Sequence, residues 1–474
     1  MDYTPPGFLD AVSHFIWTYV LIYVLLGAGI YFTLRTRFLQ FRFFGRMVRL
    51  LRGSREGAEG GISSFQAFCI GLASRVGTGN ITGVAIALTL GGPGAIFWMW
   101  IVALVGMATA FVEATLAQLY KVRSPDGSFR GGPAYYIRTG LGSPRGGVLF
   151  AVLLVFTFGI AFSMVQANTI ADVLNNAHDV DTHVSAVVLV ILLAPILFGG
   201  IRRVAGISEI VLPIMAGVYV LLALVIILLN LGSLPHVIGE IVGSAFGIGN
   251  AAAGITGGVA AALLNGTKRG LFSNEAGMGS APNTAATATT PHPANQGFIQ
   301  SLGVFVDSIL ICSATAFIIL MAGDSVYDPG KTTEAAGASL TQSAVEHVLG
   351  GWAGWIMTVL VFSFAFSSVL GNYAYCEVNI DYLGGGRRAL GVFRVIVLAS
   401  VAVGAVIALQ AVWTFADVSM GLMALVNLVA IVLLGSWAFG ALRDYERSLG
   451  AGRTPVFAAT ENPDLPGRLP TDVW

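Results

Sequence analysis

Two apolar stretches of the sequence are interrupted near their centres by glycines and polar residues of the kinds that bind a small charged ligand. The first stretch, 62–90, is interrupted by the motif GTGN at 77–80, and the second, starting near 251, by KRGLFSNEAG at 268–277. Glycine lets a helix unwind at low steric cost, and the half-helix that follows presents free N–H groups and a positive dipole end, which suit a carboxylate. In lipid, unwound backbone survives only where protein buries it or where it lines a cavity. We therefore predict a binding site between two broken membrane helices.

Each interruption also has a purely structural interpretation. A glycine kink, in which Thr78 and Asn80 hydrogen-bond back to their own helix, would explain the first, since glycine is common in membrane helices. In the second, ionisable residues at membrane depth mark either functional sites or internal ion pairs. The cations Lys268 and Arg269 could therefore pair with a buried acid, for which the candidates are Glu113, Glu275 and Asp307. That pairing does not compete with the neighbouring backbone lining a site.

The composition indicates a membrane protein. Hydrophobic residues make up 55% of the 474 residues, charged residues only 11%, and the mean hydropathy is +0.79, whereas soluble domains carry about 25% charged residues. At about 20 apolar residues for each span, the sequence predicts an all-α polytopic protein with eleven membrane helices. The expected spans are 13–34, 62–90, 94–120, 148–174, 184–199, 207–231, 251–288, 297–322, 350–381, 390–411 and 414–440.

The basic residues fall in every second connection between these spans. Seven arginines lie between Arg35 and Arg55, five basic residues lie in 121–145, and further arginines follow the spans ending at 199, 381 and 440. The other connections carry acids and a single lysine. Because basic loops stay in the cytoplasm, we expect a multi-pass protein of the cell (inner) membrane with its N-terminus outside and its C-terminus inside. The start lacks a positive n-region, so the first span is expected to be retained.

Other functional classes lack the residues that they need. The formal net charge is zero, which gives no reason to expect a nucleic-acid partner. The three cysteines all fall in apolar spans, which argues against disulfides and CxxC metal sites. The sequence contains no GxSxG, HExxH or GxxxxGK[ST] motif, so we expect neither an enzyme nor an ATP-driven pump. A cation channel is less favoured than a carrier, because channels use rings of ligands from repeated subunits.

The ten spans after the first divide into two sets of five with opposite topology, each beginning with an interrupted helix. Inverted five-helix repeats of this kind form the leucine-transporter type of fold, whose site lies between the broken helices. The expected organisation is an added helix and basic loop (1–61), a first repeat (62–232), an external interfacial segment with the second repeat (233–440), and a cytoplasmic tail (441–474). We expect an external helix in 232–250, an external gate loop in 322–349, and disorder in the proline-rich tail.

Four segments carry a specific resemblance. The strings GLASRVGTGNITGVAIAL, GGPGAIFWMW, GTKRGLFSNEAGMGSAPN and FAFSSVLGNYAYCEVN resemble the signature segments of the sodium:alanine (alanine or glycine:cation) symporter family, in the expected order over about four-fifths of the chain. The resemblance implies a symporter that couples Na⁺ to uptake of a small neutral amino acid such as alanine or glycine. We expect it to function as a monomer in the lipid bilayer. Alanine and glycine are not distinguished at this point.

The resemblance also implies residues for the amino acid. Thr78, Gly79 and Asn80 would hold its carboxylate, and an unwound 270–274 backbone, including Gly270 and Asn274, would offer carbonyls to its ammonium, with Phe272 as an apolar lid. Polar side chains on two further helices, Gln166 and Asn372, are placed to reach the site. For this last pair, hydrogen bonding between helices is an equal alternative.

Sodium would lie between the first broken helix and the span 350–381, which carries two adjacent hydroxyls, Ser367 and Ser368. Matching the fold's pattern adds the carbonyls of Ala73, Val76 and Phe364 as ligands. Taken alone, the two serines fit back-bonding to their own helix. The family's common pattern GNYYYGE reads GNYAYCE at 371–377, which leaves the substrate preference open. Proton coupling through Asp307 or Glu113 is the remaining alternative.

Overall fold

The computed structural model describes residues 7–54, 61–124, 127–248, 258–329, 331–332, 337–460, 462–470 and 473–474. The part before the first long helix consists of α1 (Phe8–Phe15), the π-helical turn η1 (Ile16–Leu21), α2 (Ile22–Arg35), α3 (Leu39–Arg42) and α4 (Phe44–Arg52). The next part contains α5 (Ser64–Arg75), η2 (Gly79–Gly83), α6 (Val84–Gly91), α7 (Gly94–Leu119), the hairpin β1 (Val122–Arg123) and β2 (Phe129–Arg130), α8 (Pro133–Gly140), α9 (Pro144–Phe156), η3 (Thr157–Phe162), α10 (Ser163–His178), α11 (Thr182–Leu197) and α12 (Gly200–Leu229).

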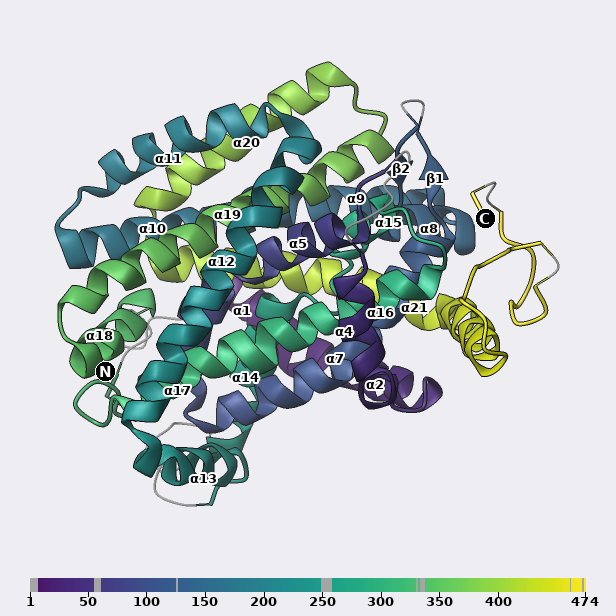
Figure 1. Cartoon of the computed structure of the whole chain (residues 1–474). Coiled ribbons are helices and arrows are strands. Elements are labelled where there is room, and N and C mark those ends of the chain that lie inside the picture. The colour runs from purple at the N-terminus through teal and green to yellow at the C-terminus, as the bar shows by residue number, and fades with distance from the viewer. Residues whose placement is uncertain are drawn as a thin grey trace.

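The remaining elements are η4 (Leu231–Ser233), α13 (Leu234–Ala245), α14 (Gly258–Asn274), α15 (Pro282–Thr287), α16 (Pro293–Val304), η6 (Phe305–Cys312), α17 (Ser313–Met321), α18 (Gly337–Leu349), α19 (Trp352–Tyr382), α20 (Arg387–Val406) and α21 (Leu409–Gly450). The helices form one bundle, and the β-hairpin lies at one end of it (Figure 1). The expected all-α class is confirmed.

Eight segments are long and apolar enough to cross a membrane, and each overlaps one expected span. They are Phe8–Arg35, Gly94–Leu119, Pro144–His178, Gly200–Leu229, Pro293–Met321, Trp352–Tyr382, Arg387–Val406 and Leu409–Gly450. A ninth expected span is matched by α11, an apolar helix of 16 residues. The other two expected spans are the broken helices α5–α6 and α14–α15. The total of eleven spans and the inverted repeat remain predictions.

The basic loops meet at one end of the bundle. Arg130 of the hairpin pairs with Asp381 at the end of α19 at 2.9 Å, and Arg42 pairs with Glu446 of α21 at 2.8 Å. Figure 1 shows the hairpin, α8 and the C-terminus at this end, while the N-terminus, α13 and α18 lie at the other. We call these the basic end and the N-terminal end. The gathering of the basic loops agrees with the charge alternation, and the direction of the N-terminus relative to the membrane stays a prediction.

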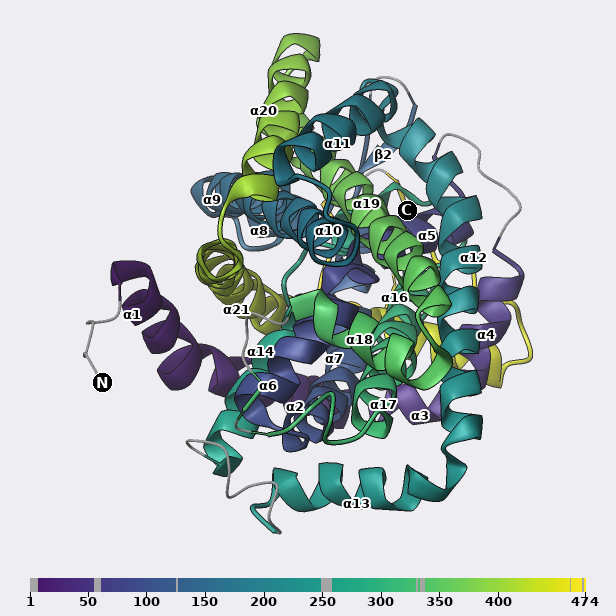
Figure 2. The same ribbon diagram turned by 90° about the vertical axis from the view of Figure 1, so that its left-hand side faces the viewer.

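Two segments outside the long helices bear on the expectations for the external loops. The expected helix in 232–250 is present as α13, which lies across the N-terminal end of the bundle (Figure 2). The connection 322–349 was expected to be a loop, but its second half forms α18, which packs against α10, η2 and α19. The first broken helix is therefore covered by a helix at this end.

The expected disorder of the tail is wrong for the described residues of 441–474. Helix α21 continues to Gly450, and the chain after it folds back onto the basic end. The Phe457 N–H donates to the Pro291 carbonyl at 3.0 Å, and Trp474 Nε1 donates to the Gln118 carbonyl at 2.8 Å. Leu465 and Leu469 are buried. The prolines suggested disorder, but the apolar residues between them supply enough contact area to pack.

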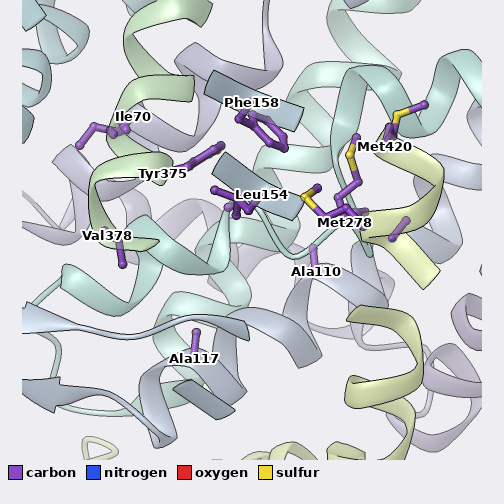
Figure 3. Close-up of a cluster of buried hydrophobic side chains, with 14 of the residues drawn as sticks. Ile70, Ala110, Ala117, Leu154, Phe158, Met278, Tyr375, Val378 and Met420 are labelled. Atoms are coloured by element: carbon purple, nitrogen blue, oxygen red, sulfur yellow. The ribbon is translucent and has the colours of Figure 1, made fainter. Parts of the chain in front are cut away.

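Two clusters of buried apolar side chains hold the bundle together, and α7 contributes residues to both. Figure 3 shows part of one of these clusters, where Phe158, Leu154 and Tyr375 lie close to one another. Close approach of α7 to α16 requires glycine, because a Cβ on Gly297 would overlap Phe111 and the Thr115 hydroxyl. Core packing thus fixes α14 and α16 on either side of α7 and positions the two breaks.

Candidate functional site

The first break follows directly from a strong helix start and two glycines. A capping box of Ser63 and Gln66 begins α5, and the helix ends at Arg75, so that 76–78 separate it from η2. A Cβ on Gly77 would overlap the Ser368 hydroxyl, and one on Gly79 would lie 3.0 Å from both the Phe272 ring and Ser273 Cα. Glycine is required here because other helices touch the backbone. A break is confirmed here, but it lies at 76–78, because Gly79 and Asn80 of the predicted 77–80 already belong to η2.

The second break lies later in the chain than predicted. Residues 268–274 are helical, because α14 runs to Asn274, and the non-helical segment is 275–281. It begins at Glu275, which has a φ of 59°, a conformation that non-glycine residues rarely adopt. Hydroxyls of Ser74 and Ser280 donate to its two carboxylate oxygens at 2.7 and 2.6 Å and hold it there. The expectation that the 270–274 backbone is unwound is therefore wrong.

The breaks nevertheless meet, and polar groups converge where they do. The Gly77 N–H donates to Asn80 Oδ1 at 2.9 Å and the Thr78 N–H to Gln166 Oε1 at 3.2 Å. Two atoms of predicted site residues are buried without a hydrogen-bond partner among the described residues, the Thr78 hydroxyl and Asn372 Nδ2. Buried polar groups are normally satisfied, so these two atoms are available to a ligand.

Phe272 forms one wall of this region. Its ring lies between the rings of Phe162 and Trp413, with both centroid distances 4.5 Å. The same ring contacts Gly79 of the first break. An aromatic layer from α14, η3 and α21 thus covers the backbone at 77–80, as a lid would.

Two predicted residues of α14 have other surroundings. Gly270 faces α7, since a Cβ there would lie 3.4 Å from Val102 and 3.6 Å from Met99 Cα. These are ordinary contact distances for a Cβ, and the structure does not bring Gly270 to the converging polar groups. Asn274 donates to the Ser308 hydroxyl at 3.2 Å and accepts from the Ala276 N–H at 3.0 Å, so it holds the end of α14 in place.

The predicted sodium ligands lie together between α5 and α19. The Ser368 hydroxyl is 2.9 Å from the Ala73 carbonyl and 3.0 Å from the Phe364 carbonyl, and the Ser367 hydroxyl is 2.9 Å from the Phe364 carbonyl. Val76 is the C-cap of α5, adjacent in sequence to Gly77. Back-bonding explains the contacts to Phe364 but not the contact of Ser368 with the other helix. These neutral oxygens suit a hard monovalent cation.

Buried charges form a group that the sequence prediction left outside the site. Asn80 donates to Asp307 Oδ1 at 2.7 Å, and the hydroxyls of Ser273 and Ser308 each donate to its Oδ2 at 2.8 Å. Asp307 therefore joins the two breaks. Arg75 is 2% exposed, donates to the Gln300 carbonyl, and interacts electrostatically with Asp307, Glu113 and Glu275. From the sequence, Asp307 was expected either to carry a proton or to pair with Lys268, Arg269 or Arg75. The structure supports the interaction with Arg75, whereas the donors from Asn80 and Ser273 were not predicted.

The cations of α14 have a partner that was not predicted. Lys268 and Arg269 both pair with Asp417 of α21, each at 2.6 Å. The expected partners Glu113, Glu275 and Asp307 are wrong, because the charged face of α14 points to α21 and not toward the break. Trp17 donates to the Asp417 carbonyl at 3.1 Å, so the first span is tied to the same cluster.

Every predicted site residue is buried: Ala73, Val76, Thr78, Gly79, Asn80, Gln166, Gly270, Phe272, Asn274, Phe364, Ser367, Ser368 and Asn372. Protein therefore covers the converging groups on all sides. A ligand can reach Thr78 only after helices move apart. The groups that could bind a ligand here are backbone N–H groups, carbonyls and hydroxyls.

Comparison with known proteins gives one consistent family. Residues 3–459 match the sodium:alanine symporter family. The chain is 49% identical over 466 residues to the amino-acid carrier protein AlsT of Bacillus subtilis (strain 168), which covers 98% of this chain and 97% of that protein. It is 48% identical over 443 residues to the probable sodium/glutamine symporter GlnT of the same organism (93% and 91%). It is 38% identical over 441 residues to the sodium/alanine symporter AgcS of Methanococcus maripaludis (92% and 95%).

Proposed function

The chain belongs to the sodium:alanine symporter family, and from that premise we propose that it couples sodium influx to uptake of a small neutral amino acid, alanine or glycine, by alternating access. The observation that carries the proposal is the junction of the two broken helices, where orphaned polar atoms of Thr78 and Asn372 lie beside a cluster of neutral oxygens. The protein is a multi-pass membrane protein and sodium is its co-transported ion.

The amino acid would lie between the first break and the end of α14. Its carboxylate would bind the free N–H groups and the Thr78 hydroxyl at the start of η2, where the helix dipole is positive. Its ammonium would face the carbonyls of the last turn of α14, which have no partner within the helix. The carbonyls that bind the ammonium were expected on unwound backbone at 270–274, and we now assign them to the end of helix α14, at 272–274. Phe272 against Gly79 leaves room only for a small side chain.

Sodium would replace the hydrogen bonds that the two serines now make. The carbonyls of Ala73, Val76 and Phe364 and the hydroxyls of Ser367 and Ser368 supply five neutral oxygens. Neutral ligands bind a monovalent ion and still release it, because no carboxylate holds it by charge. The site joins α5 to α19, so an ion bound there favours the arrangement in which these helices touch.

Alternating access follows from the burial of the site. The first break separates α5 from η2 and α6, and the second separates α14 from α15, so each half-helix has room to rock about its break. Movement of α5 and α15 would open the basic end, and movement of α6 and α14 would open the other. The ligands themselves stay at the junction.

Proton coupling through Asp307 is the second candidate. Three donors, from Asn80, Ser273 and Ser308, contact the Asp307 carboxylate. The family is one of sodium symporters, and the neutral oxygens between α5 and α19 suit a sodium ion. Sodium coupling is therefore favoured.

Uptake of labelled alanine into proteoliposomes tests the proposal. Uptake should require external sodium and stop when choline replaces sodium at constant pH. Unlabelled glycine should compete if the small pocket has been assigned correctly, and unlabelled glutamine should compete less. Full uptake in choline driven by a pH gradient would refute sodium coupling and favour the proton mechanism.

A further inference from the structure

A separate cavity of about 210 Å³ lies at the basic end, away from the junction of the breaks. Its walls come from the residues before α5, from β2, from the α11–α12 connection, from the end of α15 and from α19 (Figure 1). The residues that matter for binding are Arg130, Gly199, Gly200, Arg202, Thr287 and Glu377. Pockets for drug-sized ligands measure roughly 300–1,000 Å³, so this one suits a smaller molecule.

Glu377 is the unusual member of the cavity wall. It is 8% exposed, and its Oε2 atom has no hydrogen-bond partner among the described residues. Arg394 lies nearby, but its Nε donates to the Tyr373 hydroxyl at 2.8 Å, and no ion pair to Glu377 forms within the described part of the chain. A buried carboxylate oxygen without a partner is costly. A cationic group in the cavity would supply that partner.

Two arginines in the lining of the same cavity offer groups for an anion. Arg130 uses its Nε for Asp381 and its Nη1 for Ser128 and the Phe129 carbonyl. Arg202 is exposed and forms no ion pair with any described residue. A Cβ on Gly200 would lie 3.6 Å from Glu377 Oε2, so glycine keeps the carboxylate accessible from the cavity. A small cavity lined by one acid and two guanidinium groups matches the two charges of an amino-acid zwitterion.

The cavity also adjoins the contact that closes the basic end. The Ile62 N–H donates to the Thr287 carbonyl at 3.3 Å, and the Thr289 N–H donates to the Ile62 carbonyl at 3.2 Å. These bonds tie the start of α5 to the end of α15, and both Ile62 and Thr287 line the cavity. A ligand held between α19, the hairpin and the start of α12 would keep these elements together.

We propose that this cavity is a second, cytoplasmic-side site for a zwitterionic amino acid, and that its occupation inhibits transport from the trans side. The ammonium binds Glu377 and the carboxylate binds Arg202 and the free edge of Arg130. This inference rests on the proposed function and on the predicted cytoplasmic position of the basic end. Accumulated amino acid thereby holds the basic end closed and slows further uptake.

The test uses proteoliposomes oriented with the tail inside, as judged by protease protection of the C-terminus. They are loaded with increasing unlabelled alanine and no sodium, and initial sodium-driven uptake of external labelled alanine is measured. Internal alanine should inhibit wild-type uptake. Glu377→Gln should raise the half-inhibiting internal concentration by ~10-fold or more, as expected for loss of a charge-assisted contact, with the external KM unchanged.

Two variants keep the result interpretable. Glu209→Gln removes a charge at the same end of α12, where Glu209 accepts from Gln66 at 3.0 Å outside the cavity, and should keep wild-type inhibition. Arg202→Gln alters an exposed side chain and should raise the half-inhibiting concentration several-fold, even if Glu377→Gln does not fold.

The outcomes separate the two proposals. Absent inhibition in the wild type, or unchanged inhibition in Arg202→Gln and in any transporting Glu377→Gln protein, overturns the second site while leaving symport intact. Absent sodium-driven uptake in the wild type overturns the proposed function instead.

Discussion

Replacing Ser368 with alanine tests the sodium site most directly. The Ser368 hydroxyl contacts the Ala73 carbonyl of α5 at 2.9 Å and the Phe364 carbonyl of α19 at 3.0 Å. It is thus the side-chain oxygen that bridges the two helices of the expected ligand set. The change removes this oxygen and leaves the backbone carbonyls in place, so it weakens the ion site without deleting it.

The size of the effect follows from the count and the environment of the ligands. A hydrogen bond or ligand contact to a charged group is worth roughly 1.5–3 kcal/mol, or ~10- to 100-fold in affinity. The cost to folding should be smaller, about 0.5–1.5 kcal/mol, because in the absence of an ion the hydroxyl makes only neutral hydrogen bonds. The sodium concentration for half-maximal alanine binding should therefore rise ~10- to 100-fold in a protein that still folds.

The assay is a sodium titration of alanine binding to purified protein, repeated with Ser363→Ala. Ser363 lies on the same helix and donates to the Val359 carbonyl four residues earlier at 2.7 Å, so it reproduces the back-bonding without the contact to α5. Only Ser368→Ala should shift the sodium dependence, and at saturating sodium its alanine affinity should return to normal by linkage. An unchanged sodium dependence would refute the ion site. Alanine affinity that stays low at any sodium concentration would place the serine on the amino acid.

Three further changes probe other parts of the structure. Thr78→Val removes a buried hydroxyl that has no partner among the described residues and should weaken alanine binding ~10- to 100-fold. Thr82→Val, one turn later, removes a hydroxyl that also has no partner among the described residues and should leave alanine binding unchanged. Equal alanine affinities of the two variants in a binding titration would show that alanine does not bind at Thr78. Asp417→Asn leaves the buried Arg269 without its ion-pair partner and should destabilise the protein by about 3–5 kcal/mol, seen as a lower melting temperature; an unchanged melting temperature would contradict this. Burial lowers the pKa of His292 from 6.5, and the Asp444 carboxylate opposes this shift. Below about pH 6.5 the unfolded chain therefore binds a proton that the folded protein does not, so the folded protein should lose stability as the pH decreases. The melting temperature of His292→Gln should depend less on pH between pH 7 and 5, and an identical slope would rule out His292 as the cause.

The first break could be predicted because the glycines that allow it are visible in the sequence, although the contacts that require glycine come from other helices. Two glycines separated by one residue in an apolar span are unfavourable in a helix, and the contacts of Gly77 with Ser368 and of Gly79 with Phe272 explain why no side chain is tolerated. The serine pair was also predictable, since adjacent hydroxyls in an apolar helix have few alternative functions. What the sequence lacked was the direction in which each hydroxyl points.

The second break was misplaced because its causes are tertiary. Charged residues at 268–269 suggested that the helix could not continue through lipid. In the fold, Asp417 lies about 150 residues away in sequence and forms an ion pair with each of the two cations at 2.6 Å, and the helix continues to Asn274. The true break begins at Glu275, whose positive φ depends on Ser74 from the other broken helix. Neither partner could be assigned from local pattern.

The predictions for the tail and for the buried acids were incomplete for a related reason. A proline-rich segment can pack only against a surface that the rest of the fold has formed. The hydrogen bond of Trp474 to the Gln118 carbonyl, for example, requires the end of α7 to be in place. Asp307 could be recognised as a buried acid, yet its role as the link between the breaks depends on donors from Asn80 and Ser273, which the fold brings together. The sequence shows which polar residues cost free energy to bury more readily than it shows which partners offset that cost.

Coupling between ion and amino acid can be traced to a single glycine. Ser368 touches Gly77 on one side, while Thr78, the next residue, donates its N–H to Gln166 at 3.2 Å. The proposed sodium ligands Ala73 and Val76 and the proposed carboxylate site at Thr78 therefore lie close together in sequence, around the non-helical residues that separate α5 from η2. Ordering one of the two sites would order the other. An ion that fixes 73–77 in place removes part of the entropy cost that the amino acid would otherwise meet at 78–80. Because such coupling is reciprocal, the amino acid must tighten sodium binding by the same factor, and a carrier built in this way moves its two ligands together without any contact between them.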